Sequence, residues 1–270
     1  MVVQHNMAAS NANRQLGIST NTLSKSTEKL SSGYRINRAA DDAAGLSISE
    51  KMRSQIRGLN KASSNAQDGI SAIQTAEGAL NEAHSILQRM NELATQSAND
   101  TNTTADRTAV QSEVNALTNE LSRIASTSQF NTQNLLDGTF TGKNLQVGAL
   151  ENQKITINIG AMNAKALGVG SLDVKSFTKA GAAMTLIQKA ISKVSGQRSE
   201  LGALQNRLEH TVNNLDNISE NTQTAESRIR DTDMASEMVQ YSATSIIQQA
   251  GQSMLAQANS QTQGVLSLIQ

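Results

Sequence analysis

Apolar residues in the first half of this chain recur at alternating spacings of three and four residues. The series consists of Ile73, Ala76, Leu80, Ala83, Leu87, Met90 and Ala94. This spacing is typical of a coiled-coil seam, in which one stripe of a helix packs against a partner helix. We therefore predict one helix from about residue 44 to residue 99, which at ~1.5 Å per residue is a rod about 80 Å long. A turn at residues 99–102 is expected to end it.

Two further stretches repeat the three-four spacing. The first contains Val110, Val114, Leu117, Leu121 and Ile124. The second begins near Ala180 and contains Ile187, Ile191, Val194, Arg198, Leu201, Gln205, Leu208, Val212 and Leu215, with Arg198 and Gln205 as polar interruptions. The first stretch should fold back beside the long helix as a helical hairpin. Together the three stretches predict a helical bundle over residues 44 to about 230.

The period changes between residues 130 and 174. Leu145 and Val147, and then Ile155, Ile157 and Ile159, occupy every second position. Such alternation is typical of half-buried strands, and the glycine and asparagine between the two runs favour a tight turn. We expect a small β-hairpin within residues 140–175.

The two ends of the chain carry thinner apolar stripes among many Ser, Thr, Asn and Gln residues. Leu16, Leu23 and Leu30 recur every seven residues, and Ile247, Met254, Ala258, Val265 and Leu268 line one side of the last segment. An isolated helix of this quality is marginally stable in water. We expect both ends to become helical by pairing with each other and with neighbouring copies, and Leu16, Leu23, Leu30, Ile247, Met254, Val265 and Leu268 to drive polymerisation.

The last 33 residues, 238–270, contain no charged side chain. A flexible tail is the alternative interpretation, but such tails are normally charged or rich in Gly and Pro. A buried helix fits better, because burial would otherwise require charges to be desolvated and paired. Identical rods that repeat one heterologous contact form an open helical polymer unless the rotation closes.

The predicted fold class is mainly α: a long antiparallel helical bundle or coiled coil with a small β-hairpin region and paired N- and C-terminal helices. Residues 1–43 and 234–270 are expected to form an inner domain, and residues 44–233 an outer helical bundle. Proline is absent, so nothing interrupts long helices. Aromatic residues make up 2% of the chain, which suits thin helix packing better than a spherical core.

Charge and cysteine content exclude several classes of protein. Lys plus Arg and Asp plus Glu both total 23, so no global field favours nucleic acid or an anionic membrane. The absence of cysteine excludes disulfides, thiolate metal sites and cysteine nucleophiles. No apolar run of about 20 residues could span a bilayer, and the first residues do not resemble a secretory signal. If the protein leaves the cell, we expect a route without a cleaved signal peptide.

Catalytic and metal-binding patterns are not found. His5, His84 and His210 are isolated and lack metal-ligand spacing; His84 is expected on a helix surface. The Asp41-Asp42 pair is better explained as a helix cap than as a catalytic pair. No phosphate-binding glycine loop or nucleophile elbow is present. We expect no enzyme activity, no cofactor and no metal.

Several segments resemble bacterial flagellins. The N-terminal signature of that family matches residues 30–37 (LSSGYRIN) and 40–45 (ADDAAG). Further matches are residues 68–71 (DGIS), 75–80 (TAEGAL), 128–131 (SQFN), 228–235 (RIRDTDMA) and 261–268 (QTQGVLSL). Together these segments extend over nearly the whole chain.

The resemblance implies a structural subunit of the extracellular flagellar filament, which serves motility. It also implies an inner domain that lines a central channel and export of unfolded subunits through a flagellar type III apparatus. The implied partners are other copies of the chain, an export chaperone that holds the C-terminal segment, and the filament cap and hook-junction proteins. The interval between the second helical stretch and the one that begins near Ala180 is short. This implies that the variable outer domains of many flagellins are missing.

Flagellins are also ligands of innate receptors. Arg89, Leu93 and Glu113 match the family's contacts for the Toll-like receptor that senses flagellin, and Arg89 and Leu93 are four residues apart on one helical face. Without the resemblance, Arg89 and Glu113 would be interpreted as solvated surface charges. Residues 265–269 resemble the apolar end sensed by cytosolic inflammasome receptors, although packing in an inner filament wall is sufficient to explain them.

Two alternative functions remain at this point. A hook-filament junction protein would share the terminal pairing but would be present in few copies. The chain could also act chiefly as a host-receptor ligand or adhesin, in which case substitutions at Arg89 and Glu113 would weaken receptor binding and leave polymerisation intact.

Overall fold

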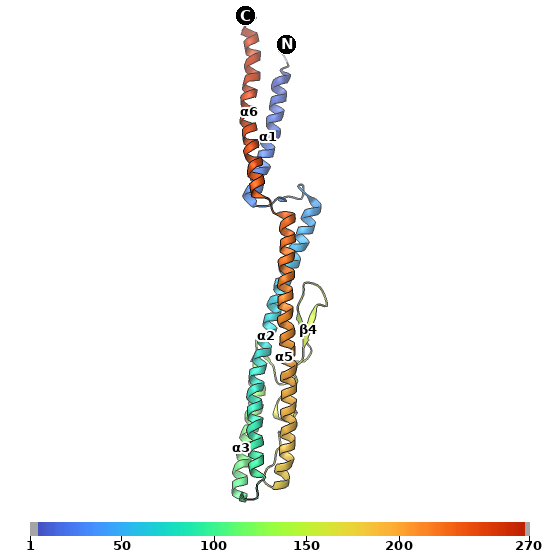
Figure 1. Ribbon diagram of the computed structural model, residues 1–270, viewed down its shortest axis with the longest axis vertical. Coiled ribbons are helices and arrows are strands. Elements are labelled where there is room, and N and C mark those ends of the chain that lie inside the picture. Colours follow the sequence, from blue (N-terminus) through green and yellow to red (C-terminus); the bar gives the residue numbers. More distant parts are fainter. Residues whose placement is uncertain (1–4, 268–270) are drawn as a thin grey trace. The chain divides into compact units, whose positions relative to one another are not determined.

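The computed structural model describes residues 5–267, and its contacts divide the chain into two compact units. The terminal unit comprises Met1–Ser54 and Asn221–Gln270, and the bundle unit comprises Gln55–Glu220. The described residues form α1 (Met7–Ser32), α2 (Ala43–Ser97), α3 (Thr104–Thr127), β1 (Gln129–Phe130), β2 (Gln133–Asn134), β3 (Lys143–Gln146), β4 (Lys154–Ile157), α4 (Ala164–Leu167), α5 (Phe177–Arg230) and α6 (Met234–Ser267) (Figure 1). The predicted fold class, long paired helices with a small strand region, is confirmed.

Polar caps define where the long helices begin. The Asn6 side chain accepts a first-turn N–H of α1, and Asp42 Oδ1 accepts the N–H of Gly45 at 2.8 Å to start α2. Thr103 and Asp106 form a capping box at the start of α3. Such caps satisfy backbone donors that have no partner within the helix. The expected capping role of the Asp41-Asp42 pair is therefore confirmed for Asp42.

The bundle unit is held together by the seam that the three-four spacing predicts. All seven apolar residues of the series from Ile73 to Ala94 are buried. They pack with buried positions of α3 and α5, among them Leu121 and Val194, in one continuous core. Toward the other end of this unit, two polar contacts tie α2 to α5: Ser63 donates to Asp216 (3.0 Å) and Ser219 donates to Asn60 (2.7 Å).

The predicted hairpin is present. β3 pairs with β4 in antiparallel register, with Leu145 opposite Ile155. Ile155 and Ile157 are buried and the residues beside them are exposed, as the alternation predicts. A second hairpin, β1–β2, was not expected from the sequence. Its two-residue turn places Asn131 and Thr132 at positive φ, the backbone conformation that tight hairpins require.

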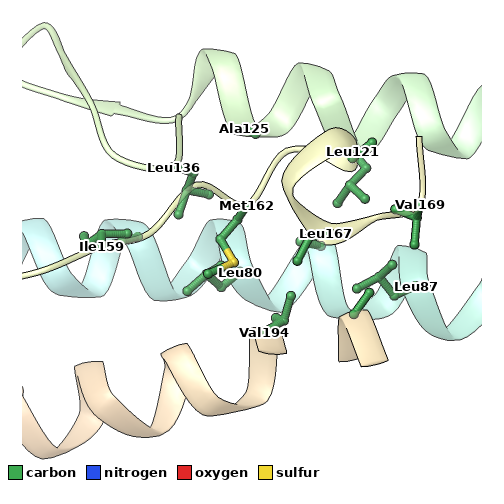
Figure 2. Packing of buried hydrophobic residues seen from close by; sticks show 14 of the residues in the cluster. Leu80, Leu87, Leu121, Ala125, Leu136, Ile159, Met162, Leu167, Val169 and Val194 are labelled. Atoms are coloured by element: carbon green, nitrogen blue, oxygen red, sulfur yellow. The ribbon is translucent and has the colours of Figure 1, made fainter. Parts of the chain in front are cut away.

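The irregular segment around the β3–β4 hairpin, residues 135–176, supplies much of the core without a repeating pattern outside the hairpin itself. Figure 2 shows Leu136, Met162 and Leu167 from this segment between α2, α3 and α5, with Met162 directed at Leu80 of α2. The short helix α4 lies within this segment and packs against α3. Long helices alone would leave a gap here, and the irregular segment fills it with buried apolar side chains.

A buried glutamine on α3 holds the end of that segment. Gln111 is 8% exposed; its side chain donates to Leu172 O at 2.8 Å and accepts from Val174 N at 2.7 Å. Ser97, the last residue of α2, donates to Val174 O. Buried backbone groups in a loop need such partners because water cannot reach them.

Candidate interaction surfaces

In the terminal unit, α1 and α6 run antiparallel along a seam of leucines and of small or polar residues. The Cα atoms of the two helices come within 8 Å of each other. The buried and half-buried residues that recur at helical spacing are Leu16, Ser19, Leu23, Ser26 and Leu30 on α1 and Tyr241, Thr244, Gln248, Gly251, Leu255 and Ala258 on α6. The most buried of these are Ser26 (3%), Thr244 (6%) and Ser19 (7%). The expected pairing of the two ends is confirmed: Leu16, Leu23 and Leu30 are half-buried on this seam, and its most buried positions are small polar residues.

The large apolar side chains of α6 point outward instead. Val239 (71% exposed) and Ile246 (66%) form one row, and Ile247 (53%) and Met254 (64%) form the next. Residues seven apart lie on the same helix face. Met7, Ile18, Met234 and Met238 add exposed apolar surface elsewhere on the same two helices. Buried polar groups and exposed large apolar groups are the informative departures from an ordinary soluble domain.

The residues predicted to drive polymerisation fall into three groups. Leu16, Leu23 and Leu30 are half-buried on the seam between α1 and α6. Ile247 and Met254 lie off this seam and are exposed. Val265 lies in α6, but its side chain, like Leu268 as a whole, is outside the described residues. The role of all seven residues in assembly stays a prediction.

The two connecting segments of the terminal unit form a clasp, defined here as residues 33–36 and 229–232. Arg35 N donates to Arg230 O (2.7 Å) and Thr232 N donates to Gly33 O (3.0 Å). Arg230 also reaches Glu50 Oε1 at 2.9 Å, and this hydrogen bond lowers the pKa of Glu50 below its ordinary value. The sequence did not predict the clasp, although both of its segments lie in stretches that match the family signature.

The three predicted receptor residues differ in accessibility. Arg89 Nη2 lies 2.9 Å from Glu113 Oε1, and Arg89 Nη1 lies 3.1 Å from Glu92 Oε2. The hydrogen bond to Glu113 raises the pKa of Arg89 further above its ordinary value. Leu93 is 1% exposed and belongs to the core of the bundle unit. The structure therefore brings Arg89 and Glu113 together on the surface of α2 and α3, whereas Leu93 is buried in the core.

The described residues offer no centre for metal chemistry. Over residues 5–267 no group of three or more His, Cys, Asp or Glu side chains could hold a metal ion. His5 and His210 are exposed, and His84 is half-buried with its Nε2 3.1 Å from Nε2 of Gln88. None of the described helices is long and apolar enough to cross a membrane.

Paired terminal helices joined to an antiparallel bundle, with apolar faces left open, define a class of helical subunits that associate laterally. Two family models identify the particular family. The bacterial flagellin N-terminal helical region matches residues 3–141 and the C-terminal helical region matches residues 184–269. The chain belongs to the bacterial flagellin family. It is a short form, in which residues 128–176 alone separate α3 from α5.

Known proteins agree with this assignment over the full length. The chain is 55% identical to flagellin of Halalkalibacterium halodurans and 49% identical to flagellin of Bacillus subtilis, with 100% of both chains covered in each case. It is 51% identical to the flagellar filament 31.3 kDa core protein of Treponema maltophilum, again over 100% of both chains. Among solved structures, Bacillus cereus flagellin matches 56% of this chain and 88% of its own, with a TM-score of 0.50 and 34% identity.

Proposed function

We propose that this chain is the structural subunit of an extracellular bacterial flagellar filament and that it polymerises through its terminal unit. The observation that carries this proposal is that α1 and α6 bury small polar residues between them and leave large apolar residues exposed. Ser19, Ser26 and Thr244 are buried between the helices, whereas Val239 and Ile246 are exposed. Covering one exposed side chain of this size contributes about 1.5–3 kcal/mol, so neighbouring copies would stabilise a hairpin that its own seam holds weakly.

The proposal includes the arrangement expected from the family. The paired terminal helices form the inner domain around a central channel, and the helical bundle lies outside it. Subunits leave the cell through a flagellar type III apparatus without a cleaved signal peptide, accompanied by an export chaperone. Growth takes place beneath a cap, on hook-junction proteins, and the product serves motility rather than catalysis.

Seeded elongation tests the proposal. Purified monomer is added to filament fragments, and the critical concentration is measured by light scattering. The double variant Val239→Ser/Ile246→Ser should raise that concentration about tenfold or more, since 1.4 kcal/mol corresponds to a factor of ten. Leu150→Ser is the matched control, because Leu150 is 60% exposed but lies in the bundle unit. Elongation of the double variant at the wild-type critical concentration would overturn the proposal.

A second proposed function is recognition by the flagellin-sensing Toll-like receptor. The observation that favours it is the exposed ion pair of Arg89 with Glu113 on adjacent helices. An exposed guanidinium and carboxylate held in fixed positions offer a partner both a donor and an acceptor. The buried side chain of Leu93 offers a partner no exposed surface, so the proposed site rests on Arg89 and Glu113.

Binding of purified monomer to the receptor ectodomain tests this second function. Arg89→Ala and Glu113→Ala should each weaken binding by about tenfold, as expected for residues at an interface centre. Arg123→Ala is the matched control, because Arg123 forms a similar exposed pair with Glu120 on α3. Equal losses for Arg89→Ala and Arg123→Ala would contradict a specific site. Leu93→Ala is unsuitable, since a large cavity in the core would destabilise the bundle by about 2–5 kcal/mol.

A further inference from the structure

A hollow of about 420 Å³ lies in the terminal unit, beside the start of α2. Three cationic side chains, Lys25, Lys29 and Arg35, line it together with Ile36, Ala40, Asp41 and Asp42. We call it the cationic hollow. Lys25 and Lys29 are four residues apart on α1 and therefore share one helix face.

The two acids of the cationic hollow are already engaged with the backbone. Asp41 Oδ2 accepts the N–H of Arg38 at 2.9 Å and that of Asn37 at 3.2 Å. Asp42 Oδ1 accepts the N–H of Gly45 as the cap of α2. The backbone hydrogen bond from Arg38 lowers the pKa of Asp41 most, and the charges of Lys25 and Lys29 lower it further. Both carboxylates therefore already accept backbone hydrogen bonds, and neither forms a direct ion pair with the lysines.

Neither lysine of the cationic hollow donates a hydrogen bond to an acid over the described residues. Lys29 forms an ion pair with Glu237, but the distance of 3.7 Å from Nζ to Oε2 is too long for a hydrogen bond. Over the described residues, Lys25 forms no ion pair or hydrogen bond. A further carboxylate that entered the hollow would meet ammonium groups with donors to spare, because each ammonium carries three.

A complementary stretch of acids lies on α5. Residues 199–227 carry five acids and, apart from Arg207, no Lys or Arg. The acids are Glu200, Glu209, Asp216, Glu220 and Glu226. Glu200 and Glu209 are exposed, and neither takes part in an ion pair over the described part of the chain. The whole chain has a formal charge of zero. The acidic stretch therefore carries a local excess of negative charge, and the cationic hollow carries a local excess of positive charge.

We propose that the cationic hollow binds a carboxylate side chain from residues 200–220 of α5 in a second copy of this chain. This inference rests on the proposed polymerisation. The hollow and the acidic stretch are different parts of the chain, so the contact is heterologous and propagates from copy to copy. Paired charges of this kind fix the register between neighbours and reject other partners. A single carboxylate fits better than a free phosphate, since Asp41 and Asp42 also line the hollow and repel an anion more strongly the more charge it carries.

Zero-length crosslinking of mixed filaments tests the contact directly. Filaments are assembled from equal amounts of ordinary and ¹⁵N-labelled chains and treated with a carbodiimide, which joins an amine to a carboxylate that touches it. Peptides that join a labelled to an unlabelled chain come from different subunits. We expect Lys25 or Lys29 joined to an acid of residues 200–220 in such mixed peptides. The Lys29–Glu237 link within one chain is the internal control for reagent activity, because these side chains lie 3.7 Å apart.

Charge removal gives a second, independent measurement. Lys25→Gln/Lys29→Gln should raise the critical concentration for seeded elongation on the order of fivefold at low salt, as expected for partly exposed pairs. The difference from wild type should shrink at 0.5 M salt, where the Debye length falls to a few ångströms. Arg14→Gln is the matched control, since Arg14 is an exposed cation of α1 outside the hollow.

The outcomes separate the two proposals. Wild-type chains that fail to elongate seeds would overturn both polymerisation and this contact. Filaments that form normally but give Lys25 and Lys29 links solely within one chain would overturn the contact and leave polymerisation standing. The contact would also be overturned if Lys25→Gln/Lys29→Gln changed the critical concentration no more than Arg14→Gln does.

Discussion

The guanidinium of Arg230 lies 4.6 Å from the centre of the Tyr34 ring. The same guanidinium bonds Glu50, and the backbone oxygen of Arg230 accepts from Arg35. One side chain and its peptide group therefore connect the end of α5 with the segment after α1 and with the first turns of α2. Gly33 makes this possible, because its φ of 75° ends α1 in a left-handed conformation that favours glycine.

Arg230→Lys should loosen the clasp. A lysine keeps the charge but cannot stack a planar group on Tyr34 and reach Glu50 at the same time. We expect amide exchange of residues 33–36 and 229–232 to accelerate on the order of fivefold, which corresponds to about 1 kcal/mol. Arg228→Lys is the control, because Arg228 is exposed and two residues away. Equal acceleration in both variants would contradict a specific role for Arg230.

Two glycines of α2 should respond oppositely to alanine. A Cβ at Gly58 would lie 2.9 Å from the Cβ and 3.3 Å from the Cα of Ala149, so the β3–β4 loop would have to move. A Cβ at Gly78 would meet nothing within 4 Å. Gly78→Ala should stabilise the bundle by about 0.8–1 kcal/mol through helix propensity. Gly58→Ala gains the same propensity but suffers overpacking of about 1–3 kcal/mol.

Thermal unfolding followed by circular dichroism measures this difference. A change of 1 kcal/mol shifts the Tm by about 2–4 °C in a protein of 150–250 residues. Gly78→Ala should therefore unfold at a higher and Gly58→Ala at a lower temperature than wild type. If both variants gained the same stability, the loop would not be in close contact with α2.

Gln111→Leu should destabilise the bundle unit through two orphaned backbone groups. Leucine is of similar size, but it leaves Val174 N and Leu172 O without the partner that Gln111 supplies. An unsatisfied buried group costs about 1–3 kcal/mol. Ser112→Ala on the exposed side of α3 is the control. Denaturant unfolding should show a lower midpoint for Gln111→Leu alone, and an unchanged midpoint would mean that water replaces the side chain.

The helices of the bundle could be predicted because burial there follows the helical period. Every apolar member of the series from Ile73 to Ala94 is buried, and Val194, Leu201 and Leu208 continue the pattern on α5. Apart from the β3–β4 hairpin, the segment from Leu135 to Val174 could not be predicted in this way. Its buried residues, such as Met162 and Val169, follow no period, because an irregular segment positions each side chain through its own turns.

The terminal helices show a different limit. The sequence correctly indicates amphipathic ends, but a stripe does not reveal whether it faces its own chain or another. Ile247 and Met254, which were expected to drive polymerisation, lie off the seam with α1 and are exposed in the single chain, so their role in assembly stays a prediction. Thr244 and Gly251 occupy the seam instead, where small side chains permit the close approach of α1. The cationic hollow and the clasp were also invisible, since both depend on the path of the connecting segments.

Acid should open the clasp. The hydrogen bond from Arg230 lowers the pKa of Glu50 below its ordinary value of 4.5. A carboxyl group whose pKa is lower in the folded than in the unfolded state contributes stability that is fully present above its ordinary pKa. That stability is lost as the pH falls through the lowered pKa. Amide exchange in residues 33–36 and 229–232, corrected for its intrinsic pH dependence, should be constant from pH 7 to about pH 5 and accelerate below about pH 4.

Glu50→Gln separates this effect from general acid unfolding. The amide still accepts a hydrogen bond from Arg230 but carries no charge, so the clasp should exchange faster than wild type at pH 7 and show a smaller acceleration in acid. Glu28→Gln is the matched control, because Glu28 pairs with Arg38 at the surface of the same unit and should leave the wild-type acid step in place. If amide exchange in Glu50→Gln still accelerated in acid as much as in wild type, other carboxyl groups would cause the pH dependence. Asp41 is the nearest of these in sequence whose pKa is lowered. Since Asp41 lines the cationic hollow, that result would move the acid-sensitive element of the terminal unit from the clasp to the hollow.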